Sequence, residues 1–174
     1  VREINVYSEI IPWHNFTALP EGCKGVILSG SPYSVRDADA PMPDLSAIIG
    51  VVPLLGVCYG AQYLALQNGG NVEASDSREY GRANLNVVNT EDALLKGMTL
   101  GSQVWMSHGD KVVKAPPGFS VIGRSDNTDI AAMADEKRGF YGLQFHPEVN
   151  HTLQGAALLD RFIKVVCGCQ ALWT

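Results

Sequence analysis

The sequence predicts a three-layer α/β domain with a mixed central sheet. Short apolar segments rich in β-forming residues recur along the chain and alternate with stretches of helical spacing. The 174 residues suffice for one domain with a substantial core, which we expect to cover residues 1–174. With 46% apolar and 18% charged residues, the composition is that of an ordinary globular protein and excludes a disordered one.

Residues 1–68 contain three predicted strands and two predicted helices. Residues 5–11 are rich in β-formers and end at a proline, so we predict a strand there, and a second strand over 24–29. A polar, proline-punctuated loop then leads to a short predicted helix over 44–50. A strongly apolar strand over 53–57 follows, and the next stretch, 59–68, has helical spacing and ends in an Asn-Gly-Gly-Asn turn.

Short β segments dominate the remainder. Five have strand composition, at residues 72–74, 83–88, 103–107, 120–125 and 130–134. A small helix over 91–96 is predicted among them. The apolar run 140–145 is a further strand, and residues 155–166 carry an apolar stripe at helical spacing that should cover one face of the sheet.

The charge, the apolar runs and the cysteines of the sequence argue against several classes of function. The net charge is −5, and no stretch gathers the Lys and Arg that phosphate binding needs, so we expect no nucleic-acid partner. Apolar runs too short for a bilayer and an opening without a signal-peptide pattern predict no membrane association and a cytoplasmic location. Cys167 and Cys169 lack the spacing of a zinc or redox site, so we interpret them as structural thiols and expect no metal.

The turn Gly-Val-Cys-Tyr-Gly at 56–60 lies between the buried strand and its helix. Glycines on both sides of a cysteine at such a junction let the backbone bend sharply and expose one side chain, as in a nucleophile elbow. The helix beginning at Tyr59 should direct its dipole toward Cys58 and favour the thiolate. Cys58 is therefore the candidate nucleophile, the alternative being a buried core cysteine.

His146-Pro147-Glu148 follows the last predicted strand and offers a base for Cys58. Proline keeps the preceding residue extended, and residues two apart in an extended chain project to the same side. Glu148 can then orient the imidazole of His146, which would take the thiol proton and return it to a leaving group. The alternative is a surface turn that matches by accident.

An oxyanion site is the third requirement of acyl-transfer chemistry. Backbone N–H groups beside the nucleophile usually supply it, and the N–H of Tyr59 is one candidate donor. The loop Gly30-Ser31-Pro32 ends a different strand at the same expected sheet edge, so Ser31 N–H is the second candidate. The alternative for this loop is a simple tight turn.

Three segments resemble the signatures of class I, triad-type glutamine amidotransferases. They are Gly-Val-Cys-Tyr-Gly-Ala-Gln at 56–62, Gln-Phe-His-Pro-Glu-Val at 144–149 and Ile-Leu-Ser-Gly-Ser-Pro-Tyr-Ser-Val at 27–35. The resemblance implies a flavodoxin-like fold with a mostly parallel sheet. It also implies that Cys58 attacks the side-chain amide of glutamine to release ammonia, and that water hydrolyses the resulting glutamyl thioester. His146 would be the general base and acid, and Glu148 the orienting carboxylate.

Within the family, residues 78–83, 106–112 and 166–169 resemble the glutaminase domains of GMP synthases. This resemblance implies that the ammonia passes to an ATP-pyrophosphatase synthetase domain or subunit, which aminates XMP to GMP. It implies contacts to the substrate glutamine from Gly30, Gln62, Ser107, Gly109 and Asp110. His108 is not needed for the triad, and we assign it to domain contact or local structure.

The chain departs from the family pattern in three places. Ser31 stands where members usually have glycine, the family's opening strand would lie ahead of Val1, and the Ser-Gly-Gly-x-Asp-Ser loop of the synthetase does not occur. We therefore expect a glutaminase domain without the synthetase. No cofactor is expected in this domain, because proton donation by His146 serves where a metal would otherwise act, and ATP and Mg²⁺ belong to the synthetase.

Two other functions compete with this interpretation. A glutaminase serving another acceptor, as in anthranilate-type synthases, is disfavoured by the Ser-His-Gly-Asp-Lys segment at 107–111. A non-catalytic regulatory domain on the same fold is disfavoured because such a domain would have no physical need for Cys58, His146 and Glu148 together.

Overall fold

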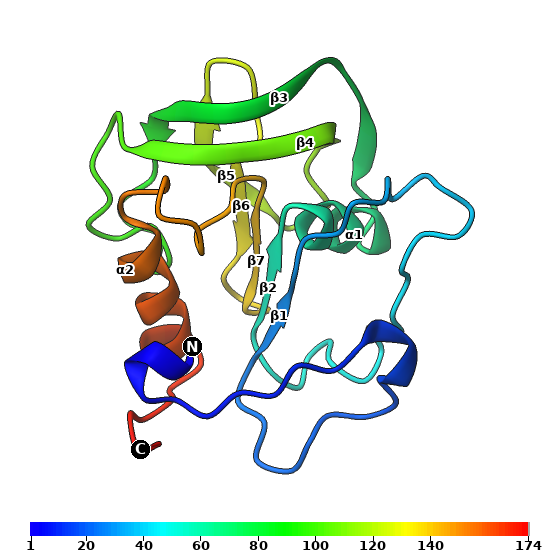
Figure 1. Cartoon of the computed structure of the whole chain (residues 1–174), viewed down its shortest axis with the longest axis vertical. Helices are drawn as coiled ribbons and strands as arrows, with labels where there is room; N and C mark the ends of the chain where they lie inside the picture. Colours follow the sequence, from blue (N-terminus) through cyan, green and yellow to red (C-terminus); the bar gives the residue numbers. More distant parts are fainter. Residues whose placement is uncertain (174) are drawn as a thin grey trace.

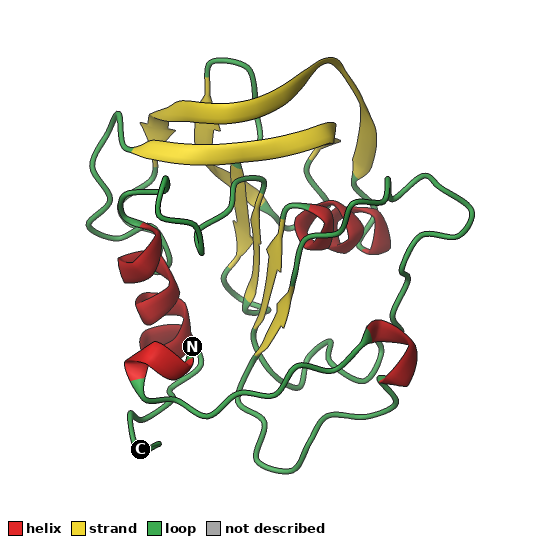
Figure 2. Cartoon of the chain, viewed as in Figure 1, coloured by secondary structure: helices red, strands yellow, loops and turns green. Residues whose placement is uncertain are grey.

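A seven-stranded sheet in the order β1-β2-β7-β6-β5-β3-β4 forms the centre of the computed structural model, which describes residues 1–173 (Figure 1). Its strands are β1 (Val26–Leu28), β2 (Leu54–Val57), β3 (Asn71–Val88), β4 (Gln103–Lys114), β5 (Ser120–Ser125), β6 (Ala132–Asp135) and β7 (Phe140–Leu143). The helices are α1 (Tyr59–Gln67) and α2 (Gly155–Asp160), and α2 continues into the π-helical η3 (Arg161–Val166). Two 3-10 turns, η1 (Arg2–Ile4) and η2 (Trp13–Asn15), precede the sheet (Figure 2).

The sheet is mixed, as predicted, but the prediction that it is mostly parallel is wrong. Only β1, β2 and β7 run parallel to one another, whereas the β7–β6, β6–β5, β5–β3 and β3–β4 pairs are antiparallel. The reason lies in the connections. Parallel neighbours need a long crossover, and after α1 the chain returns through loops that carry no α-helix until β7 is complete.

Helices cover opposite faces of the parallel strands and produce two cores. One core joins Leu55 of β2 to Phe162 and Ile163 of η3, and the other joins Leu54 of β2 to Leu64 of α1. Neighbouring residues of a strand point to opposite faces, so a strand buried on both sides is apolar throughout. This explains why β2 and β7 consist of buried residues only.

The long strands β3 and β4 form an antiparallel ribbon across the upper end of the parallel strands in Figure 1. Residues 72–74 and 83–88, predicted as two separate strands, are parts of the single strand β3. The pairing of β3 with β4 is interrupted by a bulge between Ala74 and Glu79. One end of the ribbon packs into the core under α2, through Val104 and Met106, and the other packs into the core under α1, through Val112. The ribbon therefore links the two cores.

The predicted helices over 44–50 and 91–96 are turns instead. In the first, Ile48 and Ile49 N–H both donate to Leu45 C=O, and Gly50 ends the turn at a φ of 76°. In the second, Asp92 Oδ1 accepts the N–H groups of Leu94 and Leu95. Segments this short gain too few helical bonds to offset the cost of nucleation. The helix over 59–68 and the helical segment over 155–166 are confirmed.

The strand predicted over 5–11 is also wrong. This segment leaves η1 through Asn5, whose φ is 60°, and then runs without strand pairing along the lower side of the molecule (Figure 1). Ile10 is 94% exposed. β-forming side chains do not make a strand where no neighbouring strand takes up their backbone hydrogen bonds. The strands predicted over 24–29, 53–57, 120–125, 130–134 and 140–145 are confirmed with small shifts in their ends.

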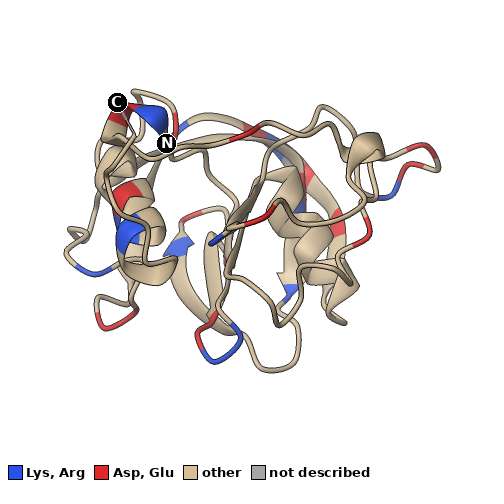
Figure 3. Cartoon of the chain, turned by 90° about the horizontal axis from the view of Figure 1, so that it is seen from below, with Lys and Arg blue, Asp and Glu red and all other residues tan. Residues whose placement is uncertain are grey.

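Charged side chains are distributed over many elements. Figure 3 shows Lys and Arg interspersed with Asp and Glu along the loops, the helices and the ribbon. Within residues 1–173, neither helix combines the length and apolarity that a membrane span requires.

Candidate active site

Cys58 occupies a sharply bent position between β2 and α1. Its backbone has a φ of 52° and a ψ of −109°, a conformation that residues other than glycine rarely adopt. Its side chain is almost fully buried. Cys58 N–H donates to Leu143 C=O of β7 at 2.7 Å, while its own C=O accepts the N–H of Ala61 and Gln62 in the first turn of α1. The predicted elbow is thus present and is fixed from both sides.

Close backbone packing explains the two glycines of the elbow. A Cβ on Gly60 would lie 2.2 Å from Leu28 O of β1, and one on Gly56 would lie 2.5 Å from Gly60 O. Atoms cannot approach so closely, so only glycine lets α1 start directly against β1 and β2. The spacing of the motif therefore reflects steric limits on how tightly the chain turns.

His146 and Glu148 form the predicted pair at the end of β7. His146 Nδ1 donates to Glu148 Oε1 at 2.7 Å, which leaves Nε2 available for proton transfer. A hydrogen bond with Cys58, and next the bond to Glu148, outweigh burial and raise the pKa of His146 to about 10. Burial alone would raise the pKa of Glu148, but the bond from His146 lowers it. The imidazole is therefore held as a cation beside Cys58 and Glu148.

Two further residues hold the loop that carries His146. Trp105 of β4 accepts the N–H of His146 at 3.0 Å through its backbone oxygen, and its own N–H donates to Thr152 Oγ1. The hydroxyl of Thr152 in turn donates to the backbone oxygen of His146 at 2.5 Å. The sequence did not point to Thr152 or Trp105, since neither belongs to a motif and their contact depends on the position of the ribbon.

The predicted oxyanion loop lies against the nucleophile. A Cβ built on Gly30 would be 3.2 Å from His146 Cε1 and 3.7 Å from Cys58 Cβ, so the loop passes directly beside both. Tyr59 begins α1, and its N–H has no acceptor within the helix. The hydroxyl of Tyr59 donates to the backbone oxygen of Pro41, and this bond holds the loop around Pro41 against α1. The oxyanion role of Ser31 and Tyr59 N–H stays a prediction.

The remaining predicted substrate contacts lie on α1 and on β4. Ser107 O is 3.4 Å from Cys58 Sγ, so this carbonyl borders the site. Gln62 is buried, and its Nε2 donates to Asp110 O at 2.8 Å and to Gln144 Oε1 at 3.2 Å. Gly109 lies between Ser107 and Asp110 in β4. The elements thus bring these residues together, and their contacts with glutamine stay predictions.

The carboxylate of Asp110 is already engaged within the protein. Ser34 Oγ donates to one of its oxygens, and Arg36 Nη2 lies 3.3 Å from the other. Both partners come from the loop after Gly30. Ser34 lies in the segment 27–35 that resembles a family signature, whereas Arg36 lies in the part predicted only as a polar loop. A substrate amino group would therefore have to share or displace the Arg36 contact.

His108 is buried in the ribbon beside this site. Its Nδ1 lies 2.9 Å from Asp110 O and its Nε2 lies 3.3 Å from Glu79 Oε2, so it contributes to local structure. Burial lowers the pKa of His108.

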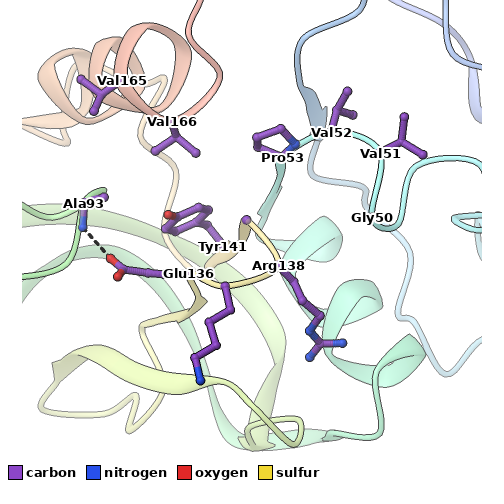
Figure 4. A pocket seen from close by; sticks show the side chains of 12 residues that line it. Gly50, Val51, Val52, Pro53, Ala93, Glu136, Arg138, Tyr141, Val165 and Val166 are labelled. Carbon is purple, nitrogen blue, oxygen red and sulfur yellow. Dashed lines mark hydrogen bonds between the residues drawn. The ribbon is translucent and has the colours of Figure 1, made fainter.

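A separate hollow of about 540 Å³ lies at the opposite end of the parallel strands, where Pro53 precedes β2 and Gly139 precedes β7. Figure 4 shows Tyr141 at its centre, between Val166 and Arg138. Its lining contains none of the predicted site residues. The triad therefore lies away from this hollow.

Comparison with known proteins identifies the family. Residues 1–166 match the family described as glutamine amidotransferase class-I. The chain is 50% identical over 174 residues to a glutamine-hydrolysing GMP synthase of Cytophaga hutchinsonii, and 51% identical over 181 residues to one of Stenotrophomonas maltophilia. Each alignment covers 100% of this chain and 34% of the relative, so the chain spans about a third of the length of these relatives.

A solved structure agrees with this assignment. The crystal structure of a putative GMP synthase subunit from Thermoplasma acidophilum superposes with a TM-score of 0.71 at 27% identity, over 85% of this chain and 74% of that chain. The family match extends over nearly the whole chain and includes the elbow, the histidine and the glutamate whose geometry is described above. The chain belongs to the class I glutamine amidotransferase family.

Proposed function

We propose that the chain is the glutaminase part of a glutamine-hydrolysing GMP synthase. The observation that carries the proposal is the arrangement of Cys58 at a strained elbow beside a His146–Glu148 pair whose imidazole is held as a cation. This arrangement suits attack on an amide, because the nucleophile and the proton donor for the leaving nitrogen are adjacent. The similarity to GMP synthases over the full chain supports GMP synthesis as the reaction that the ammonia serves.

In the first half of the reaction, the thiolate of Cys58 attacks the side-chain amide carbon of glutamine. The C–S bond forms as the carbonyl π electrons move to oxygen, and the resulting oxyanion lies within reach of the N–H groups of Tyr59 and Ser31. His146 then gives its proton to the amide nitrogen. The C–N bond breaks, ammonia leaves, and a glutamyl thioester and a neutral imidazole remain.

In the second half, water hydrolyses the thioester. Neutral His146 removes a proton from water as its oxygen attacks the thioester carbon, and the C–S bond breaks to give the thiolate of Cys58 and a side-chain carboxylic acid. The acid loses its remaining proton to solvent and leaves as glutamate. Glu148 stabilises the imidazolium that re-forms, through the bond at 2.7 Å. The site thereby returns to its starting ion pair.

Substrate positioning is assigned to the surroundings of the triad. Gly30 leaves space beside Cys58 and His146. The backbone oxygen of Ser107 in β4 borders the sulfur, and Gly109 and Asp110 lie farther along the same strand. A carboxylate is the natural partner of the α-ammonium of glutamine. Asp110 is therefore proposed to bind this group after its contact with Arg36 loosens.

The rest of the proposal concerns the partner. Relatives that are called glutamine-hydrolysing GMP synthases are about three times as long as this chain, which supports a further, synthetase part. We propose that this part uses ATP with Mg²⁺ and aminates XMP with the released ammonia. A cytoplasmic location completes the proposal. The cysteines of the described residues are free thiols, as is usual in a reducing compartment.

A glutamine-mimicking chloroketone tests the nucleophile. Incubation followed by peptide mass spectrometry should place the label on Cys58, and Cys58→Ala should abolish both labelling and glutamine hydrolysis. Cys23→Ala, which removes a half-buried cysteine of another loop, should leave both intact. Label on any other residue would contradict the assignment.

A second measurement tests the pathway. Addition of an ATP-pyrophosphatase synthetase partner with ATP and XMP should raise the rate of glutamine hydrolysis, because a site that feeds a synthetase is expected to be completed on docking. Stimulation by chorismate with an anthranilate-type partner instead would favour the competing acceptor.

A further inference from the structure

Gln144 contacts the sulfur of the nucleophile and has no role in the scheme above. It directly follows β7, its side chain is 2% exposed, and its Nε2 lies 3.7 Å from Cys58 Sγ. The larger radius of sulfur makes this a hydrogen-bond distance. A buried amide that points at a reactive atom needs an explanation, because burial of a polar group is unfavourable unless it is hydrogen-bonded.

The orientation of the Gln144 amide follows from its neighbours. The backbone oxygen of Asp110 can only accept, so the amide group that faces it at 2.8 Å is the Nε2 of Gln62. The same nitrogen donates its second hydrogen over 3.2 Å, and its acceptor is therefore Gln144 Oε1. With its oxygen turned toward Gln62, Gln144 necessarily presents its NH₂ group to the sulfur.

His108 strengthens the fixed end of this chain of bonds. Its Nδ1 lies 2.9 Å from the same Asp110 oxygen, which can only accept, so Nδ1 carries the proton. Two donors from different elements thus hold the Asp110 carbonyl in place. The orientation of both glutamine amides is then determined by groups of the ribbon.

We propose that Gln144 is a catalytic residue that donates a hydrogen bond to the Cys58 thiolate, and that Gln62 is the positioning residue that fixes the Gln144 amide. The inference rests on the proposed role of Cys58 as nucleophile. A hydrogen bond from a buried neutral amide stabilises a thiolate more than a thiol, because the bond is stronger when its acceptor is charged. Gln144 therefore assists His146 in keeping the sulfur ionised before attack.

Ser107 opposes this effect from the other side of the sulfur. Its backbone oxygen, 3.4 Å from Sγ, can accept the S–H of the thiol but offers nothing to the thiolate. The sulfur of Cys58 thus has a donor, Gln144, and an acceptor, the Ser107 carbonyl, within hydrogen-bond distance. The titratable groups around the sulfur are His146 with Glu148 behind it, Tyr59 at the start of α1, and His108 and Asp110 of β4 beyond Gln62.

The test is the pH profile of alkylation at Cys58, in variants that leave all of these titratable groups unchanged. Gln144→Met keeps the length of the side chain and removes the donor. With iodoacetamide, whose iodide the thiolate displaces, we expect alkylation of the Cys58 peptide at neutral pH to slow about tenfold and its midpoint to shift upward by about one pH unit. Alkylation of Cys23 in the same sample should be unchanged.

Two variants separate the contact from general effects of substitution. Gln62→Met leaves Gln144 in place but frees its amide to turn, so we expect a shift in the same direction and of smaller size. Gln154→Met is the matched control, because Gln154 is also a hydrogen-bonded glutamine but bonds to Thr99 and Gly97. It should keep the wild-type profile.

A wild-type alkylation profile in folded Gln144→Met overturns the proposal. If circular dichroism shows that this variant is unfolded, Gln144→Leu decides instead. It also removes the donor and adds no charge beside the sulfur, so slower alkylation supports the proposal and an unchanged profile overturns it. The readout needs no glutamine. A protein that fails to hydrolyse glutamine even with the synthetase partner, ATP and XMP, but shows the Gln144-dependent profile, would refute the proposed function and leave the hydrogen bond standing.

Discussion

The parallel strands β1, β2 and β7 and the antiparallel β3–β4 ribbon both reach the active site but contribute to it differently. The parallel strands are buried and hold Cys58 through close backbone contacts, such as that between Gly60 and Leu28. The ribbon alternates buried and half-buried positions along most of β4 and contributes backbone oxygens at Trp105, Ser107 and Asp110. One region fixes the reacting atoms, and the other surrounds them with acceptors.

This difference predicts unequal tolerance of substitution. Where backbone packs on backbone, an added methyl group has no side chain to displace, and the elbow itself must move. In the ribbon, side chains are in contact with solvent on one side, and small changes are absorbed locally. The same substitution should therefore have different effects in the two regions.

The largest effect is expected for Gly60→Ala. Its Cβ would lie 2.2 Å from Leu28 O, and the backbone shift should destabilise the protein by about 3 kcal/mol or more, well beyond the roughly 1 kcal/mol that alanine gains over glycine in a helix. Gly109→Ala of β4 is the matched control, since its nearest neighbour is Arg78 Cγ at 3.9 Å. Urea unfolding should place its change within about 1 kcal/mol. Equal losses in both variants would contradict the contrast.

The second effect concerns His146, whose loop joins the two regions through Trp105. Its pKa is raised in the folded protein to about 10, so the stabilisation that it contributes is fully present below its ordinary value near 6.5 and is lost as pH rises through about 10. The free energy of unfolding should therefore fall over this range in the wild type. His146→Ala should show a flatter dependence, and parallel curves for the two proteins would argue against the ion pair.

The smallest effect is expected for Arg36→Ala, beside the ribbon. The Arg36 side chain is 51% exposed, so loss of its contact with Asp110 should cost less than about 1 kcal/mol of stability. Removal of a competing cation should lower the KM for glutamine by about two- to fivefold. Arg124→Ala, which removes an arginine of similar exposure paired with Asp129 at 3.9 Å, should change neither quantity. A raised KM in Arg36→Ala would indicate that Arg36 binds glutamine itself.

The parts of the fold that the sequence predicted well are those with strong local signals. The elbow strand and its helix combine a fully apolar run with two glycines, and β5 has the composition of a strand. The pair His146 and Glu148 was predictable because two residues in one extended segment determine their own spacing. Such features depend on neighbours in the chain and need no knowledge of the rest of the molecule.

The parts that were missed depend on distant partners. Residues 5–11 have the composition of a strand and remain unpaired, while residues 75–82 were left unassigned and form the middle of β3, where β4 pairs with residues 79–82 beyond the bulge. The contacts of Arg36 with Asp110 and of Thr152 with Trp105 join segments far apart in sequence, and no local pattern encodes them. The antiparallel direction of most of the sheet is likewise a property of the connections.

The backbone conformation of Cys58 places stability and catalysis in conflict at one residue. A residue with a side chain at a φ of 52° and a ψ of −109° stores about 1–3 kcal/mol of strain, which glycine at the same position would largely release. Laboratory selection for heat resistance alone would thus favour glycine at position 58 and discard the nucleophile. Engineering of this domain for robustness has to retain selection for turnover throughout.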